Sequence, residues 1–231
     1  LPQVNPMFFP NKHLFIHIPK TGGTSLEYAI ASKYFHSKQA SNKQDNPYKS
    51  LLNKGQLGKV NRSKIEEMAY EEFTIHGHFK KFKKGKGGHP HSFISEYDEH
   101  LDIDDYLKFV VLRNPFDQVV SLYNQLRKQV EIPSLESFIL GDEIHTIKKY
   151  DHYINQYEFT HIDGDLRVDK VFVFDHYDKA QKFVEDSFNL RIDKSLRLWK
   201  TEYTDESLST KARDHFESQH HKSIELYNRF I

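Results

Sequence analysis

A lysine, two glycines and three hydroxyl residues lie together in the short segment Pro19–Ser25, whose sequence is PKTGGTS. The apolar run His13–Ile18 directly precedes it and predicts a buried strand, and Leu26, Ala29 and Ile30 after it fall on one helical face. At a junction of strand, tight turn and helix, backbone N–H groups point inward and the helix dipole favours negative charge. The segment therefore predicts a site for a phosphorylated ligand, unless it is a plain glycine turn that carries an exposed lysine.

The order of the residues in this loop restricts the class of ligand that it can be expected to bind. A Walker A loop places its lysine after its glycines, whereas Lys20 precedes Gly22 and Gly23. The chain also contains no Gly-x-Gly-x-x-Gly fingerprint, which weakens a dinucleotide interpretation. An ordinary ATP- or GTP-binding loop is thus disfavoured, although a nucleotide or small-molecule kinase with a divergent loop remains an alternative.

A second strand-to-helix junction lies downstream. Leu107–Leu112 has the composition of a central strand, and Pro115 suits the first turn of a helix. Arg113 follows the strand at the end where open α/β sheets bind ligands, and its guanidinium can hold a phosphate bidentately. Ser121 lies two helical turns further on and can complete that grip. Together they predict a second anion site; for Arg113 the alternative is a structural ion pair with a helix.

One pair of histidines stands out among the fifteen in the chain. His76 and His78 flank Gly77 at the end of a short predicted strand, and positions i and i+2 of a strand share a face. Histidine near its unperturbed pKa suits the removal of a proton from a hydroxyl group. The pair is a candidate for general-base catalysis, with surface or metal-binding histidines as the alternative.

Three segments resemble one known family. Ile16–Leu26 is similar to the 5'-phosphosulfate-binding loop of the sulfotransferase superfamily, and Phe109–Tyr123 is similar to its 3'-phosphate-binding strand and helix. The match is best to the carbohydrate branch that includes heparan sulfate 2-O-sulfotransferase and its bacterial relatives. The His76-Gly77-His78 pattern resembles the segment that carries the catalytic histidines of that branch.

The resemblance implies a fold, a donor and a set of catalytic roles. The expected fold is α/β, a P-loop-like three-layer sandwich with a central, mostly parallel sheet flanked by helices, in a single domain over residues 1–231. The expected donor is 3'-phosphoadenosine-5'-phosphosulfate (PAPS), bound without a metal because lysine, arginine and loop amides supply the positive charge. His78 would be the general base and His76 would orient or assist it, while Lys20 would stabilise the leaving phosphate.

A further short segment, Arg197–Thr201, resembles the late basic loop that closes over the nucleotide in these enzymes. The resemblance is tight only over residues 13–30, 75–79 and 107–123. The residues expected to bind the donor are Lys20, Thr21, Gly22, Gly23, Thr24, Ser25, Arg113, Ser121, Lys200 and Thr201.

The implied acceptor is a hydroxyl group, most simply that of a carbohydrate. Directly after the histidine pair, Lys81, Lys83 and Lys84 belong to a basic loop that would draw in an acidic glycan, or else is simply solvated. This cluster is too short to predict a nucleic-acid site. Gln118 stands in the region where the branch carries an arginine implicated in acceptor recognition, so the same uronic acid specificity is not expected.

The composition sets outer limits on function. Basic and acidic residues number 33 each, so no overall charge directs the chain to nucleic acid or a membrane surface. The absence of cysteine excludes disulfides, thiolate zinc sites and a cysteine nucleophile. With no signal-peptide pattern or membrane-length apolar run, we expect a cytoplasmic, bacterial enzyme. A lumenal Golgi-type fragment is the alternative for location, and a catalytically silent nucleotide- or glycan-binding module is the alternative for function.

Overall fold

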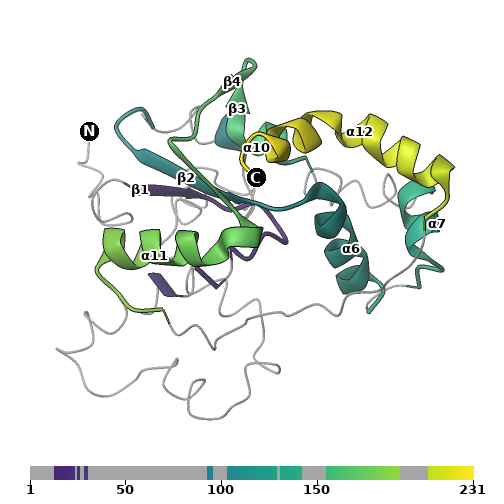
Figure 1. Cartoon of the computed structure of the whole chain (residues 1–231), viewed down its shortest axis with the longest axis horizontal. Helices are drawn as coiled ribbons and strands as arrows, with labels where there is room; N and C mark the ends of the chain where they lie inside the picture. The colour runs from purple at the N-terminus through teal and green to yellow at the C-terminus, as the bar shows by residue number, and fades with distance from the viewer. Residues whose placement is uncertain are drawn as a thin grey trace, which may run out of the picture.

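Three parallel strands form the centre of the fold in the computed structural model, which describes residues 13–23, 25–26, 29–30, 93–95, 103–128, 131–141, 155–192 and 208–231. The strands are β1 (His13–Ile16), β2 (Leu107–Leu112) and β5 (Lys170–Val173), in the order β1-β2-β5. Figure 1 shows the sheet between α11 on one side and α10 and α12 on the other. The predicted α/β class, with a parallel sheet flanked by helices, is confirmed.

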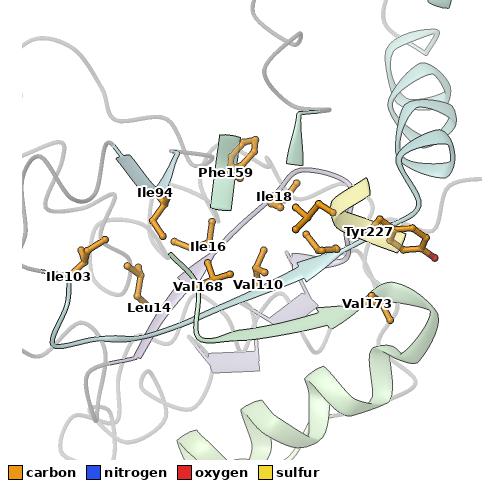
Figure 2. Close-up of a cluster of buried hydrophobic side chains, with 12 residues drawn as sticks. Leu14, Ile16, Ile18, Ile94, Ile103, Val110, Phe159, Val168, Val173 and Tyr227 are labelled. Carbon is orange, nitrogen blue, oxygen red and sulfur yellow. The ribbon is translucent and has the colours of Figure 1, made fainter. Parts of the chain in front are cut away.

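The alternation of side chains along the strands explains why both faces of the sheet are covered. Successive residues of a strand point to opposite faces, and β1 and β2 are apolar at nearly every position, as expected for a strand buried on both sides. One face joins a core with Ile94, Phe159 and Tyr227 (Figure 2). The residues that β1 and β2 contribute to this core are Leu14, Ile16, Val110 and Leu112.

The opposite face of the sheet packs against α11 (Tyr177–Phe188). Phe15 and Phe109 stack with ring centroids 4.8 Å apart. They belong to a second core cluster, to which α11 adds Ala180, Val184 and Phe188. Two apolar faces on one sheet produce the three layers.

The other described elements complete the fold. They are α6 (Pro115–Leu126), α7 (Leu135–Leu140), α10 (Gln156–Thr160), the hairpin β3 (His161–Ile162) and β4 (Asp165–Leu166), the 3-10 turn η1 (Phe174–His176) and α12 (Thr210–Asn228). Helices α6, α7 and α12 share a third apolar cluster beyond the end of β2, which includes Val119, Phe138 and Phe216 (Figure 1). Within the described ranges, no helix is both long and apolar enough to cross a lipid bilayer.

Two strand boundaries differ from the predicted ones by one or two residues. The first strand ends at Ile16 rather than Ile18, because the Ile18 carbonyl accepts a hydrogen bond from Thr21 Oγ1 at 2.9 Å and so belongs to the following turn. The apolar run Val171–Phe174 likewise predicts a strand. The observed strand β5 covers Lys170–Val173, and Phe174 opens the 3-10 turn. Strand β2 has the predicted bounds.

Candidate active site at the carboxyl edge of the sheet

The carboxyl ends of the three parallel strands meet at one edge, which is where open α/β sheets bind their ligands. The turn after β1 carries Lys20, β2 leads directly to Arg113, and β5 leads to Phe174. The fold thereby brings together three segments that are far apart in the sequence. We call the turn from Pro19 to Gly23 the phosphate loop.

The backbone of the phosphate loop has the conformation of a tight turn at a helix start. Lys20 has φ 65° and Gly22 has φ 87°, both in the left-handed region. For a residue with a side chain, such as Lys20, this conformation costs about 1–2 kcal/mol. Helical geometry begins at Gly23, and the N–H of Ser25 donates to the carbonyl of Gly22 at 3.1 Å. The predicted strand–turn–helix junction is therefore present.

Both glycines of the loop are closely covered by side chains. A Cβ on Gly22 would lie 2.9 Å from ring carbons of both Phe174 and Tyr177. A Cβ on Gly23 would lie 2.2 Å from Cδ2 of His17, whose ring is buried and stacked on Phe15 at 5.6 Å. The glycines thus let the loop backbone approach the side chains of its own scaffold.

Gly22→Ala should destabilise the protein more than Gly164→Ala. Gly164 has φ 91°, close to that of Gly22, but a Cβ there would lie 4.0 Å from Tyr157 Oη, in ordinary van der Waals contact. Both variants carry a backbone strain of about 1–2 kcal/mol, and Gly22→Ala adds about 1–3 kcal/mol of overpacking against Phe174 and Tyr177. Chemical denaturation measures the free energy of unfolding of both variants. An equal decrease in the two variants would show that the rings of Phe174 and Tyr177 move aside freely.

The hydroxyl groups of the loop have partners within the fold. Thr21 is fully buried, and its hydroxyl donates to the Ile18 carbonyl. Tyr177 Oη donates to the Gly22 carbonyl at 2.7 Å and is also hydrogen-bonded to the Ser25 side chain. Burial raises the pKa of Tyr177, and the bond with Ser25 offsets only part of that rise. The phenol therefore stays protonated and can donate its hydrogen bond to the Gly22 carbonyl.

Arg113 lies against the phosphate loop. Its Nη1 donates to the Lys20 carbonyl at 3.0 Å, and its guanidinium carbon lies 4.8 Å from the centroid of the Phe174 ring. The buried Gln156 fixes the backbone of Arg113 from both sides, because its amide donates to the Arg113 carbonyl at 2.6 Å and accepts from the Arg113 N–H at 3.0 Å. The two predicted anion sites are therefore neighbours.

One face of α6 points at the phosphate loop. Gln118 Nε2 donates to the Pro19 carbonyl at 2.8 Å, and Lys20 Nζ donates to Gln125 Oε1 at 3.0 Å. Ser121 is buried and lies between Gln118 and Gln125 on the same helical face, since positions three and four apart are neighbours. Asn114 caps this helix by accepting from the N–H groups of Phe116 and Asp117.

The structure places Arg113 against the turn that carries Lys20, Thr21, Gly22 and Gly23, and the N–H of Ser25 is bonded to this turn. Ser121 lies on the same face of α6 as Gln118 and Gln125, which contact that turn. The structure adds four contact residues that the motifs do not single out as part of the donor site, namely Gln118, Gln125, Gln156 and Tyr177. The spacing of Gln118, Ser121 and Gln125 puts three polar residues on one face of the helix, which is a signal that points to Gln118 and Gln125. For Gln156 and Tyr177 the sequence offers no such spacing.

Several predicted site residues lie outside the described residues. They are Thr24 of the loop, the candidate catalytic histidines His76 and His78, the basic residues Lys81, Lys83 and Lys84, and Lys200 with Thr201. Their roles stay predictions.

A further polar contact at this edge joins α12 to the turn after β5. Tyr227 Oη donates to Asp175 Oδ2 at 2.7 Å. Burial, the bond to Asp175 and the negative charges of Asp175 and Asp117 raise the pKa of Tyr227 to about 12. The contact fixes the C-terminal helix next to the site.

The sequence also matches the model of a known protein family. A family model described as Sulfotransferase family matches residues 8–225, a range that includes the phosphate loop, Arg113 and α6. The chain belongs to the sulfotransferase family. The predicted superfamily is confirmed, and the reaction class of this family is the transfer of a sulfuryl group.

A crystal structure of a sulfotransferase from Alicyclobacillus acidocaldarius is similar at 14% sequence identity and a TM-score of 0.44, over 96% of this chain and 97% of that one. No curated protein matches the chain.

Proposed function

We propose that this sulfotransferase moves the sulfuryl group of PAPS to a hydroxyl group of a carbohydrate, by in-line transfer with a histidine as general base. The family gives the reaction class. Our proposal adds three assignments to this reaction class: PAPS as the donor, a carbohydrate as the acceptor and His78 as the general base.

The contact between Arg113 and the phosphate loop is the observation that carries the choice of donor. Arg113 Nη1 lies 3.0 Å from the carbonyl oxygen of Lys20, so a guanidinium adjoins a loop built to bind an anion. PAPS has a 5'-phosphosulfate and a 3'-phosphate on one ribose, and therefore needs two neighbouring anion sites. The loop suits the first group, and Arg113 with Ser121 suits the second.

The residues have distinct roles in the proposed transfer. The acceptor oxygen attacks sulfur while the bond from sulfur to the bridging oxygen of the 5'-phosphate breaks, and adenosine 3',5'-bisphosphate leaves. His78 takes the proton of the acceptor hydroxyl, with His76 orienting or assisting it. Lys20 stabilises the charge that builds on the bridging oxygen. Its bond to Gln125 uses one of three ammonium donors and holds the side chain beside the loop.

A carbohydrate acceptor is supported by the resemblance of the loop and the histidine pair to the carbohydrate branch of the superfamily. The basic residues Lys81, Lys83 and Lys84 follow that pair and would favour a glycan that is already acidic. Incubating the enzyme with PAPS that carries labelled sulfate and a panel of neutral and acidic glycans tests this part. Label on a small alcohol but on no glycan would contradict it.

Adenosine 3',5'-bisphosphate should bind tightly in the presence of EDTA. The positive charge of the site comes from Lys20, Arg113 and backbone N–H groups, so no magnesium is needed to neutralise the phosphates, in contrast to kinase sites. Isothermal titration calorimetry with and without magnesium measures this, and ATP serves as the comparison ligand. A magnesium-dependent preference for ATP would contradict the proposed donor.

A further inference from the structure

Side chains from three different elements hold the carbonyl groups of the phosphate loop. The donors come from α6, from the end of β2 and from α11. The pairs are Gln118 Nε2 with the Pro19 carbonyl at 2.8 Å, Arg113 Nη1 with the Lys20 carbonyl at 3.0 Å, and Tyr177 Oη with the Gly22 carbonyl at 2.7 Å.

Because the peptide bond is planar, these contacts also fix the direction of the N–H group that follows each carbonyl. A trans peptide is planar, and its C=O and the N–H of the next residue point in opposite directions. No cis peptide occurs in the part of the chain that the structure describes. The N–H groups of Lys20, Thr21 and Gly23 therefore point away from the side chains that hold the preceding carbonyls. Successive backbone N–H groups that face one space can bind an anion, and these three N–H groups are left for a ligand by the side chains that hold the carbonyls.

Gln118 contributes a buried polar side chain to this arrangement. Its side chain is 1% exposed on a helix whose other buried positions, such as Val119 and Leu122, are mostly apolar. Burying an amide among apolar groups costs free energy unless the amide is hydrogen-bonded. Here the Nε2 group of the amide donates to a loop 99 residues away in the sequence, so the phosphate loop supplies the acceptor for this buried donor.

We propose that Gln118 is a positioning residue for the 5'-phosphosulfate group: it holds the Pro19 carbonyl toward α6 and thereby aims the Lys20 N–H at the ligand. This assignment rests on the proposed function. It also gives Gln118 a role on the donor side, whereas the resemblance to the carbohydrate branch implies an acceptor-recognising arginine in that region of those enzymes.

Two adenosine nucleotides distinguish this role from a general contribution to folding. Adenosine 3',5'-bisphosphate engages the phosphate loop, and adenosine 3'-monophosphate lacks the 5'-phosphate. In Gln118→Met, which keeps the side-chain volume but removes the donor, we expect the Kd of the bisphosphate to rise about tenfold. The Kd of the monophosphate should stay within about twofold. Calorimetry on the intact chain measures both.

A second variant and a matched control keep the test independent of folding defects. Gln118→Asn retains the amide but is one methylene shorter, and it should show the same selective loss. Gln219→Met makes the same change at an exposed position of α12 and should alter neither affinity.

The outcomes separate this assignment from the proposed function. If both nucleotides weaken equally in the Gln118 variants, or if neither weakens, Gln118 does not position the loop. If the wild-type protein binds neither nucleotide, the proposed donor is wrong and this assignment falls with it.

Discussion

His78→Ala should lower the rate of sulfuryl transfer by about 10²–10⁴-fold while the affinity for adenosine 3',5'-bisphosphate stays within about twofold. A general base acts on the acceptor proton in the transition state, so its loss affects kcat and not the binding of the donor product. Labelled transfer at saturating PAPS and calorimetry on the same preparation measure the two quantities.

The control for this variant is His221→Ala. His221 is exposed on α12, where its Nδ1 contacts the Ser218 carbonyl at 3.1 Å, and its loss should change neither quantity. If transfer and nucleotide affinity fall together in His78→Ala, the histidine belongs to the donor site and another residue is the base. His76→Ala should retain more activity than His78→Ala if His76 only orients the base.

Arg113→Ala should have the opposite pattern and weaken the binding of adenosine 3',5'-bisphosphate by about a hundredfold. Two charge-assisted hydrogen bonds to a phosphate contribute about 1.5 kcal/mol or more each, and about 2.7 kcal/mol is a hundredfold change in Kd. The variant also removes the bond from Nη1 to the Lys20 carbonyl, so the phosphate loop loses one of its side-chain contacts. Calorimetry measures the Kd.

Two further variants show which property of Arg113 matters. Arg113→Lys keeps the charge but lacks the planar fork, so we expect an affinity between those of the wild type and Arg113→Ala. Arg127→Ala removes the same charge at the exposed end of α6 and should leave the Kd unchanged. An unchanged Kd in Arg113→Ala would remove Arg113 from the donor site.

The variants of Arg113 and Gln118 act on neighbouring carbonyls and should differ in ligand selectivity. Gln118 contacts the phosphate loop and has no proposed contact with the 3'-phosphate. Its replacement should therefore weaken the binding only of nucleotides that carry a 5'-phosphate. Arg113 touches the loop and is proposed to bind the 3'-phosphate, so its loss should weaken both adenosine 3',5'-bisphosphate and adenosine 3'-monophosphate. The same pair of nucleotides therefore tests both residues.

Local sequence patterns predict the three strands of the parallel sheet, to within two residues at their ends, and the start of α6. Leu107–Leu112 is apolar on both faces, which in a short segment is typical of a strand between two layers, and β2 has those bounds. Asn114 and Pro115 form a helix start whose geometry depends on adjacent residues alone. The first strand was predicted two residues too long, because the Thr21 side chain takes the Ile18 carbonyl.

The contacts that shape the site were not predictable in the same way. Gln118 meets Pro19 across 99 residues, Lys20 meets Gln125 across 105, and Gln156 meets Arg113 across 43. Glutamine is common on helices, and its amide can bond to any carbonyl within reach. Its partner is thus set by how the helix packs and not by the neighbouring sequence.

The sequence by itself predicted the family, the tight turn after the first strand and the place of Arg113 directly after the second strand, because the order of apolar residues, glycines and prolines restricts the backbone locally. Only the tertiary structure decided how that loop is held. The carbonyls of Pro19, Lys20 and Gly22 are bonded to Gln118, Arg113 and Tyr177, which come from three elements. The direction of the loop N–H groups follows from those bonds, since each planar peptide turns its N–H away from its carbonyl.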